Sequence, residues 1–407
     1  MTVTSTSTIH TGKKMFCIKT SFLLFMLLWV NIGFAQYTLH INITSLPGTH
    51  SADTVFIAGN FNSWDPGNVN YKLTKTRTAN NTDLLSIDIA GLQGGIYEFK
   101  FTRGHWDKAE ATADGKSISN RIIKLESDST IECSIEAWTD DFAQAAKPHT
   151  ASSNVHVMDT VFFMPQLYRT RKIWIYLPPD YSTSKKKYPV LYMHDGQNLF
   201  DEYTSGYGEW GVDECLDSII KKGKPGCIVV GIDNGPKRMN EYNPYEFSDH
   251  GPGEGDAYIL FLVETLKPYI DKHYRTMSSR ENTFIAGSSM GGLISYYAML
   301  RYPDVFGKAG IFSASFWIAP QVNELTDLLA GKSKGQFFFY AGEMEDSSMV
   351  PNMKMIAEKL AENSSTLIYT VTDPEGRHNE AAWRKWFEEF YLWITGNGLS
   401  YQIKTKD

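Results

Sequence analysis

The residues that could do chemistry in this chain gather around one serine, Ser289. It stands at the centre of the pentapeptide Gly-Ser-Ser-Met-Gly at positions 287–291, which fits the Gly-x-Ser-x-Gly pattern of a nucleophile elbow. The apolar run 283–286 precedes this pentapeptide and a helical stretch, 292–301, follows it, so the sequence predicts a strand, a sharp turn and a helix. Glycines at 287 and 291 would relieve steric crowding at such a turn. We therefore expect Ser289 to be a nucleophile that attacks a carbonyl carbon.

A serine hydroxyl needs a base that removes its proton during attack. His378 is the only histidine that follows Ser289, and it lies between the apolar run 366–371 and a predicted helix at 379–395. Folds with such an elbow order their groups as serine, acid and histidine, which places the acid after the strand predicted at 336–340. Three acids follow that strand: Glu343, Glu345 and Asp346. We favour Glu345, although the residues by themselves leave the other two open.

Acyl transfer also needs N–H groups that stabilise the oxyanion. One is expected from the backbone of Met290, which follows the nucleophile. The other is expected from the loop after the apolar run 190–193, where the amide of Gly196 or of Gln197 is the candidate. Glycine at 196 would permit a close backbone approach, and an ordinary turn is the alternative interpretation.

Two further residues, Arg238 and Tyr242, could orient a substrate. They follow the apolar run 227–232, at the carboxyl edge where ligands bind in open α/β sheets. A simple ion pair of Arg238 with Glu241 or Asp249 within the loop would explain the arginine equally well.

The elements that must position these residues form two predicted domains. Across residues 155–407, short apolar runs alternate with helical stretches, which is typical of an α/β fold with a mainly parallel, doubly wound sheet. The predicted strands there are 190–193, 227–232, 283–286, 309–312, 336–340 and 366–371, and the predicted helices are 210–221, 255–272, 290–301, 351–362 and 379–395. Residues 36–138 alternate apolar and polar side chains, which predicts a small antiparallel, immunoglobulin-like β-sandwich. Residues 139–154 lose this alternation and are interpreted as a linker.

The first 35 residues have the features of a signal peptide. Lysines precede the apolar run 22–30, and Gly33 and Ala35 offer small side chains before a cleavage at Gln36. The run is short for a membrane span, so we expect export to the periplasm or the extracellular space without stable membrane insertion. An uncleaved anchor is the alternative.

Composition narrows the function further. The chain has 407 residues, of which 42% are hydrophobic and 21% charged, as in ordinary globular proteins. Its net charge of −7, with no basic stripe, argues against nucleic-acid binding.

Beyond the predicted signal peptide the cysteines are Cys133, Cys215 and Cys227, so at most one disulfide is expected, most simply between the last two. No spacing indicates a metal site, and no cofactor is expected.

Residues 165–396 resemble the secreted esterase family that includes feruloyl and acetyl-xylan esterases, enterobactin-type siderophore esterases and esterase D. The matching stretches are 173–181, 194–201, 234–244, the elbow at 287–291 and 376–383. The resemblance implies an α/β-hydrolase fold and a serine esterase with Ser289 as nucleophile and His378 as base. In many members the acid falls three residues after a glycine at the strand end, which corresponds to Glu345 here.

The first domain resembles starch- and glycogen-binding modules. The resemblance rests on residues 55–65, residues 95–107 and the pair Asn120-Arg121. It implies that Trp64 and Trp106 stack on a polysaccharide, although the 13 residues between Trp106 and Asn120 exceed the usual spacing. A domain that only packs against the catalytic domain or shapes its site is the alternative.

The sequence thus predicts an exported serine ester hydrolase that acts on a small-molecule or glycan-linked ester. Two other classes stay open. One is a non-catalytic carbohydrate-binding or scaffold protein with a degenerate hydrolase domain. The other is an acyltransferase on the same fold, which would pass the acyl group to a sugar in place of water.

Overall fold

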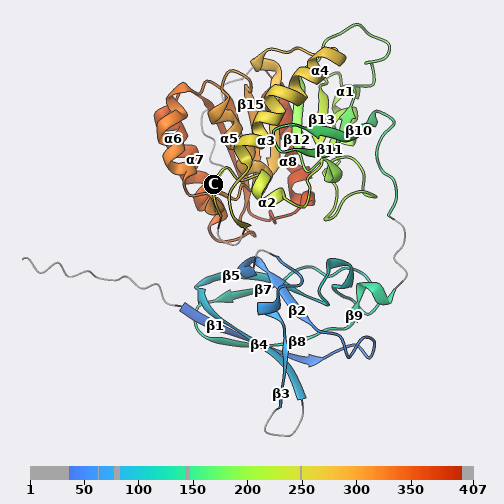
Figure 1. Cartoon of the computed structure of the whole chain (residues 1–407), viewed down its shortest axis with the longest axis vertical. Coiled ribbons are helices and arrows are strands. Elements are labelled where there is room, and N and C mark those ends of the chain that lie inside the picture. Colours follow the sequence, from blue (N-terminus) through green and yellow to red (C-terminus); the bar gives the residue numbers. More distant parts are fainter. Residues whose placement is uncertain (1–35, 63, 78–82, 143–146, 248–249, 397–407) are drawn as a thin grey trace, which may run out of the picture.

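The computed structural model describes residues 36–62, 64–77, 83–142, 147–247 and 250–396 (Figure 1). The predicted signal peptide at residues 1–35 and Asp249 lie outside these ranges. Within them, no helix has both the length and the apolar character that a membrane crossing requires.

An eight-stranded mixed sheet forms the centre of the C-terminal domain (Figure 1). Its order is β10-β11-β13-β12-β14-β15-β16-β17. β11 pairs antiparallel with β10 and β13, and all pairs from β13 to β17 are parallel, so the prediction of a mainly parallel α/β sheet is confirmed. The strands are β10 (Val155–Met164), β11 (Arg169–Tyr176), β12 (Val190–His194), β13 (Ile228–Ile232), β14 (Thr283–Ser288), β15 (Lys308–Phe312), β16 (Gln336–Gly342) and β17 (Leu367–Asp373).

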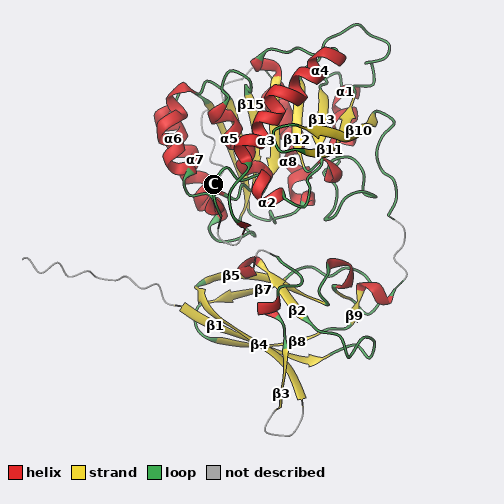
Figure 2. Ribbon diagram, in the orientation of Figure 1, coloured by secondary structure: helices red, strands yellow, loops and turns green. Residues whose placement is uncertain are grey.

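Helices cover both faces of this sheet (Figure 2). Apolar residues of α3 to α7 form one core with the sheet, and those of α1 and α8 form the other. The helices are α1 (Val212–Lys221), α2 (Arg238–Glu241), α3 (Gly255–Phe261), α4 (Lys267–His273), α5 (Met290–Arg301), α6 (Val322–Leu329), α7 (Met349–Asn363) and α8 (Glu380–Thr395). A π-helical segment, Leu262–Leu266, separates α3 from α4, where one continuous helix was predicted.

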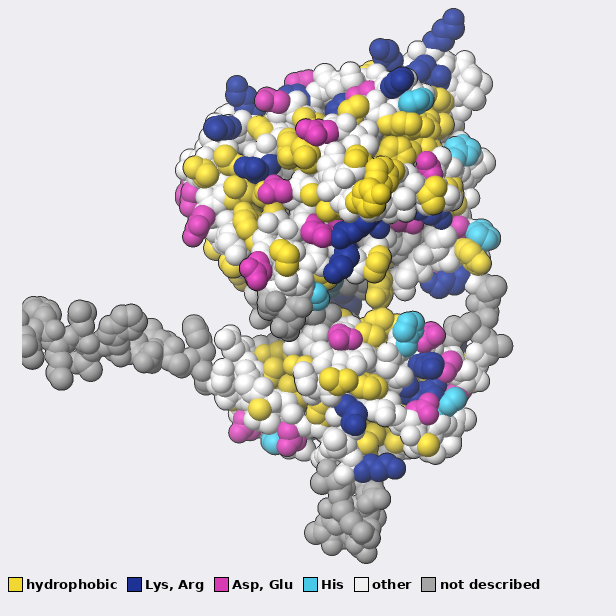
Figure 3. Space-filling model, viewed as in Figure 1, with side chains coloured by type: hydrophobic (Ala, Val, Ile, Leu, Met, Phe, Trp, Pro, Cys, Tyr) yellow, Lys and Arg dark blue, Asp and Glu magenta, His cyan; other side chains and the backbone are white. Residues whose placement is uncertain are grey.

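The edge of the sheet carries apolar side chains on its surface. β10 is the outermost strand, and Figure 3 shows hydrophobic side chains gathered over this part of the domain. Val161, Phe163 and Tyr168 are exposed there, and the register of β10 with β11 shifts on both sides of Asp159. Exposure on one side and an irregular register explain why β10 was not predicted from an apolar run.

The N-terminal domain consists of β-sheets around its own apolar core. Its sheets have the orders β3-β4-β1-β8, β2-β5-β7 and β6-β9. β1 and β8 run parallel, unlike the antiparallel pairing that was predicted throughout. A parallel pair needs a long crossover, and the chain between these two strands, which contains β2 to β7, provides one. The strands are β1 (Gln36–Ser45), β2 (Phe56–Gly59), β3 (Thr74–Arg77), β4 (Asp83–Gln93), β5 (Gly95–Thr102), β6 (Glu110–Ala111), β7 (Arg121–Leu125), β8 (Ser129–Ser134) and β9 (Ala137–Trp138).

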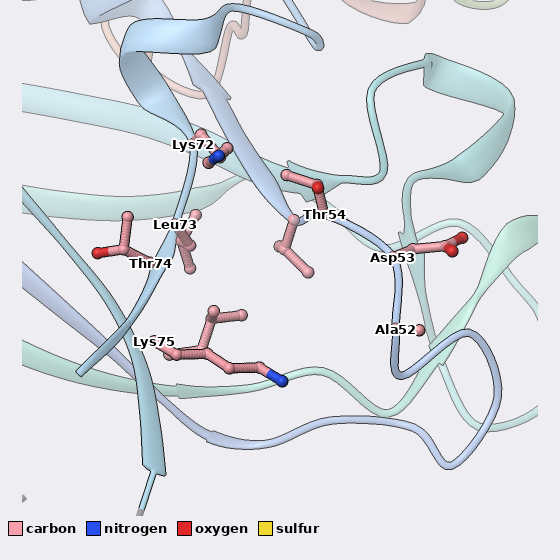
Figure 4. Close-up of a pocket in the computed structure, with 9 residues that line it drawn as sticks. Ala52, Asp53, Thr54, Lys72, Leu73, Thr74 and Lys75 are labelled. Atoms are coloured by element: carbon pink, nitrogen blue, oxygen red, sulfur yellow. The ribbon is translucent and has the colours of Figure 1, made fainter. Parts of the chain in front are cut away.

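An open hollow of about 280 Å³ lies on the N-terminal domain (Figure 4). Its walls come from residues 52–55, 72–75 and Leu85, so none of them belongs to the domain that carries Ser289. The hollow is therefore separate from the predicted chemistry.

Residues 147–154 lie against the C-terminal domain. Three of them donate hydrogen bonds to carboxylates of that domain at 2.7–3.0 Å. The pairs are Thr150 with Asp201, Ser152 with Asp213 and Asn154 with Asp217. This part of the region that was interpreted as a linker is thus held in place by hydrogen bonds.

The three cysteines of the described residues are free thiols. The pairing of Cys215 with Cys227 that the sequence favoured is therefore not present. Burial raises the pKa of both thiols to about 12, so they are inert, neutral side chains at ordinary pH.

Candidate active site

Ser289 occupies a strained turn between β14 and α5. Its backbone has φ 58° and ψ −122°, a conformation that residues other than glycine rarely adopt. A Cβ atom on Gly287 would lie 2.9 Å from the carbonyl carbon of Gly291, so glycine is required where the turn closes. The backbone N–H of Ser289 donates to the carbonyl of Phe312 at 2.9 Å, which fixes the turn to β15. The local sequence thus holds Ser289 at the carboxyl end of a central strand.

His378 and Glu345 lie in direct contact. Nδ1 of His378 is 2.6 Å from Oε2 of Glu345, and the carboxylate is 1% exposed. Its other oxygen, Oε1, accepts hydrogen bonds from the hydroxyl of Ser313 and the N–H of Gly342, both at 2.7 Å. The carboxylate can therefore hold the imidazole in one orientation, with Nε2 left free to act as a base.

The two other acids that the sequence left open, Glu343 and Asp346, are exposed side chains. Neither has a hydrogen bond to His378 within the described residues. Burial and contact with the imidazole therefore distinguish Glu345 from both neighbours.

Two glycines let the loop of His378 approach that of Glu345. A Cβ atom on Gly376 would lie 2.8 Å from the Cα of Gly342, and one on Gly342 would lie 2.2 Å from the carbonyl oxygen of Gly376. The N–H of Met344 donates to that carbonyl at 3.0 Å. The contact between Glu345 and His378 thus depends on the absence of side chains at 342 and 376.

The surroundings of His378 make it more basic. Burial acts to lower its pKa, but the hydrogen bond and the negative charge of Glu345, together with the charge of Glu380, outweigh that effect and raise the pKa. The edge of Trp383 packs against the imidazole, with ring centroids 5.2 Å apart, and the Trp383 indole N–H donates to Ser313 at 2.9 Å. The imidazole side chain is 37% exposed, so solvent can reach it.

The hydroxyl of Ser289 has a different partner from the one predicted. Its Oγ lies 3.2 Å from Oγ of Ser315, and within the described residues it has no hydrogen bond to His378. Neither Ser313 nor Ser315 was singled out from the sequence. They follow the apolar run 309–312 and therefore lie at the same carboxyl edge as the elbow, which is a signal that could have found them.

The expected oxyanion groups lie at the beginnings of helical segments. Met290 is the first residue of α5, and Gly196 and Gln197 begin the 3-10 helix Gly196–Asn198. N–H groups in a first helical turn have no acceptor within their own helix. A Cβ on Gly196 would lie 2.8 Å from the backbone of Gly231, so only glycine lets this loop pack against β13.

Arg238 belongs to a polar cluster around the buried Asp195. Its guanidinium donates to both carboxylate oxygens of Asp195, each at 2.8 Å, and Asn234 donates to the same carboxylate at 2.6 Å. Glu241, one of the two acids considered for Arg238, instead pairs with Arg169 and Arg171. The arginine thus fixes Asp195, the residue that precedes Gly196.

Tyr242 contacts the Asp195 of this cluster from the interior of the domain. Its side chain is fully buried, and its hydroxyl accepts a hydrogen bond from the N–H of Asp195 at 3.3 Å. Asp195 has φ 57°, a left-handed conformation that this hydrogen bond and Arg238 help to maintain. Tyr242 therefore supports the loop of Gly196 from inside the domain.

A second buried acid, Glu380, lies beside His378 and was not identified from the sequence. Burial raises its pKa from 4.5 to about 7, and the side-chain amide of Asn198 donates to it at 3.2 Å. Asn198 belongs to the same short helix as Gly196 and Gln197. Glu380 thus connects the region of His378 with the loop of the expected oxyanion groups.

In the N-terminal domain, Trp64 and Trp106 lie close together, with ring centroids 6.2 Å apart. The pair Asn120-Arg121 is engaged within the domain, since Asn120 donates to Glu98 and Arg121 pairs with the buried Glu110. Asn120 and Arg121 therefore use these polar atoms in contacts within the domain.

One group of side chains in the described residues could hold a metal ion. His50, Asp140 and Asp141 bring three ligand atoms within 4.8 Å of one another. The buried guanidinium of Arg103 contacts Asp140 and supplies a positive charge at that place. This charge opposes cation binding, and the group lies in the N-terminal domain, apart from Ser289.

Comparison with known proteins shows the family of this chain. Residues 165–394 match the Esterase family, described as "Putative esterase", and the chain belongs to that family. It is 32% identical over 202 residues to the ferri-bacillibactin esterase BesA of Bacillus subtilis, covering 43% of this chain and 67% of BesA. It is 27% identical over 154 residues to an endo-1,4-beta-xylanase/feruloyl esterase of Xylanibacter ruminicola, covering 37% of this chain and 20% of that protein.

The fold is similar to that of the enterobactin esterase FES from Shigella flexneri. The TM-score is 0.51 at 17% identity, and the match covers 88% of this chain and 92% of that structure. The match extends beyond the 230 residues or so of the esterase domain, so it includes part of the N-terminal domain. The chain spans less than two thirds of the length of the first three curated relatives that it matches.

Proposed function

We propose that this protein is a serine ester hydrolase with Ser289 as nucleophile, His378 as general base and Glu345 as the acid that orients His378. The contact of 2.6 Å between His378 and the buried Glu345 is the observation that carries the proposal, together with the strained elbow that holds Ser289. Membership of the Esterase family supports the same reaction class.

In the proposed reaction, the Oγ of Ser289 bonds to the carbonyl carbon of an ester while its proton moves to Nε2 of His378. The electron pair of the carbonyl bond moves onto oxygen, where the N–H groups of Met290 and of Gly196 or Gln197 stabilise the charge. The carbon–oxygen bond to the alcohol then breaks, and His378 returns the proton to the leaving alcohol. Water attacks the acyl-enzyme by the same route and releases the acid and Ser289.

For the substrate, we propose acyl esters of carbohydrates or related small esters. The names of BesA and of the Xylanibacter protein refer to a siderophore and to feruloyl esters, which makes both classes worth testing. We further propose that the protein is exported after cleavage before Gln36 and that Trp64 and Trp106 contact a polysaccharide. Mass spectrometry of the mature N-terminus and retention on an insoluble glucan test these two points.

The reaction is tested with a fluorophosphonate probe and a panel of esters. The wild type should label at Ser289 and hydrolyse p-nitrophenyl, feruloyl or acetyl-sugar esters or a siderophore lactone, and Ser289→Ala should abolish both labelling and turnover. Retention of full activity in Ser289→Ala would refute the proposal. Product analysis with an added glycan acceptor separates hydrolysis from acyl transfer.

A further inference from the structure

The turn that follows β15 touches both ends of the proposed catalytic triad. Ser313 donates its hydroxyl hydrogen to Oε1 of Glu345 at 2.7 Å. Two residues later, Ser315 places its Oγ 3.2 Å from Oγ of Ser289. One short segment therefore contacts the proposed acid through one serine and the proposed nucleophile through another.

Ser315 is held firmly in this place. Its side chain is 4% exposed, and its backbone N–H donates to the carbonyl of Ser289 at 3.2 Å. Within the described residues, Oγ of Ser289 is the one hydrogen-bond partner of the Ser315 hydroxyl. A buried hydroxyl that lacked this partner would lose a hydrogen bond without compensation from water.

The direction of this hydrogen bond follows from what the proposed reaction requires. Ser289 has one hydroxyl proton, and that proton must be available to His378 when attack begins. If Ser289 donated to Ser315, the proton would point away from the base. If Ser315 donates, it occupies one lone pair of Ser289, leaves the Ser289 proton free for His378, and holds Oγ in one orientation for attack.

We propose that Ser315 is a positioning residue that donates a hydrogen bond to Oγ of Ser289 and so accelerates formation of the acyl-enzyme. The proposal rests on the proposed function, because it assigns Ser315 a role only in activating Ser289. Ser315 acts through the nucleophile, and its hydroxyl neither gains nor loses a proton in the net reaction.

The test measures the rate constant of fluorophosphonate labelling, with kcat and KM for a p-nitrophenyl ester, in the full-length protein. Ser315→Ala should lower the labelling rate constant and kcat/KM by about tenfold, the value of one neutral hydrogen bond. The midpoint of the pH profile should stay as in the wild type, because His378 and Glu345 are untouched. The melting temperature should fall by no more than the loss of one buried hydrogen bond explains. Ser315→Thr keeps the hydroxyl and should restore most of the rate.

Further variants distinguish a specific role of the Ser315 hydroxyl from a general disturbance of the site. Ser288→Ala removes a buried serine beside the nucleophile and should label at the wild-type rate. If Ser315→Ala does not fold, Ser315→Cys preserves the volume with a weaker donor and should show a similar loss. Labelling of Ser315→Ala at the wild-type rate or faster would overturn the role of Ser315. A wild type that does not label at Ser289 would instead overturn the proposed function.

Discussion

The substitution Glu345→Gln is the sharpest test of how His378 is held. Oε1 of Glu345 accepts two hydrogen bonds, from Ser313 and from Gly342, so in the variant the carbonyl oxygen of glutamine must stay on that side. The amide nitrogen then takes the place of Oε2, 2.6 Å from Nδ1 of His378 in the wild type. An amide nitrogen only donates, so Nδ1 must become an acceptor and the imidazole proton must move to Nε2.

A histidine that carries its proton on Nε2 cannot accept the proton of Ser289. The wrong tautomer in a serine triad lowers kcat by about 10⁴, which is about 5 kcal/mol of transition-state stabilisation. The variant removes a charge without changing side-chain volume, so the fold should be retained. The pKa of His378 should also fall, because the hydrogen bond and the charge that raise it are lost.

The assay is kcat/KM for a p-nitrophenyl ester as a function of pH, with circular dichroism as the check on folding. We expect a loss of about 10³ to 10⁴ at all pH values, with the acidic limb of the residual activity moved to lower pH. Glu343→Gln and Asp346→Asn are the matched controls, since both side chains are exposed, and should keep the wild-type rate. A folded Glu345→Gln enzyme within tenfold of the wild type, or an equal loss in Glu343→Gln, would refute the reasoning.

Three further predictions follow from the contacts around the site. Gly376→Ala places a Cβ 2.3 Å from the hydroxyl of Tyr340. It should lower the free energy of unfolding in urea by about 1–3 kcal/mol and kcat for ester hydrolysis by about 100-fold. Unchanged values of both would show that this contact is not tight. Arg238→Met leaves the buried carboxylate of Asp195 without its ion-pair partner and should lower the free energy of unfolding by about 3 kcal/mol in the same urea assay. Adding Asp195→Asn should recover part of that stability. A further loss in the double variant, equal to the loss from Asp195→Asn alone, would contradict this pairing. Glu380→Gln removes an acid whose pKa is raised from 4.5 to about 7, and such an acid destabilises the folded state progressively as pH rises through that window. The melting temperature of Glu380→Gln relative to the wild type should therefore rise between pH 5 and pH 8, by the equivalent of about 3 kcal/mol at most, and a constant difference would contradict the burial argument.

Much of the large domain could be predicted because its central strands are buried on both faces. All residues of β12, β13 and β14 are buried, so each strand appears in the sequence as a short, continuous apolar run. The elbow after β14 and the helix at 290–301 could be predicted with it, since a turn with glycines follows such a run directly. The outer strands β10 and β11 mix apolar with polar side chains and gave no comparable signal.

The details of the site depend on packing that spacing in the sequence does not encode. Glu343, Glu345 and Asp346 are chemically similar, and only the fold of their loop buries one carboxylate against His378. Likewise, Ser315 is separated from Ser289 by a whole helix and strand, and the parallel pairing of β14 with β15 brings them together. The parallel pairing of β1 with β8 also could not be predicted from alternation alone, because alternation is the same in both pairings.

The unequal exposure of His378 and Glu345 bears on the fate of the acyl group in the proposed reaction. The Glu345 side chain is fully buried, while more than a third of the His378 side chain is exposed to solvent. An imidazole that is open on one side can recruit its second nucleophile from the solvent, where water far outnumbers any sugar alcohol. Transfer to a glycan would therefore demand an acceptor that is itself bound beside the imidazole and displaces water from it, so in dilute solution release of the free acid should prevail.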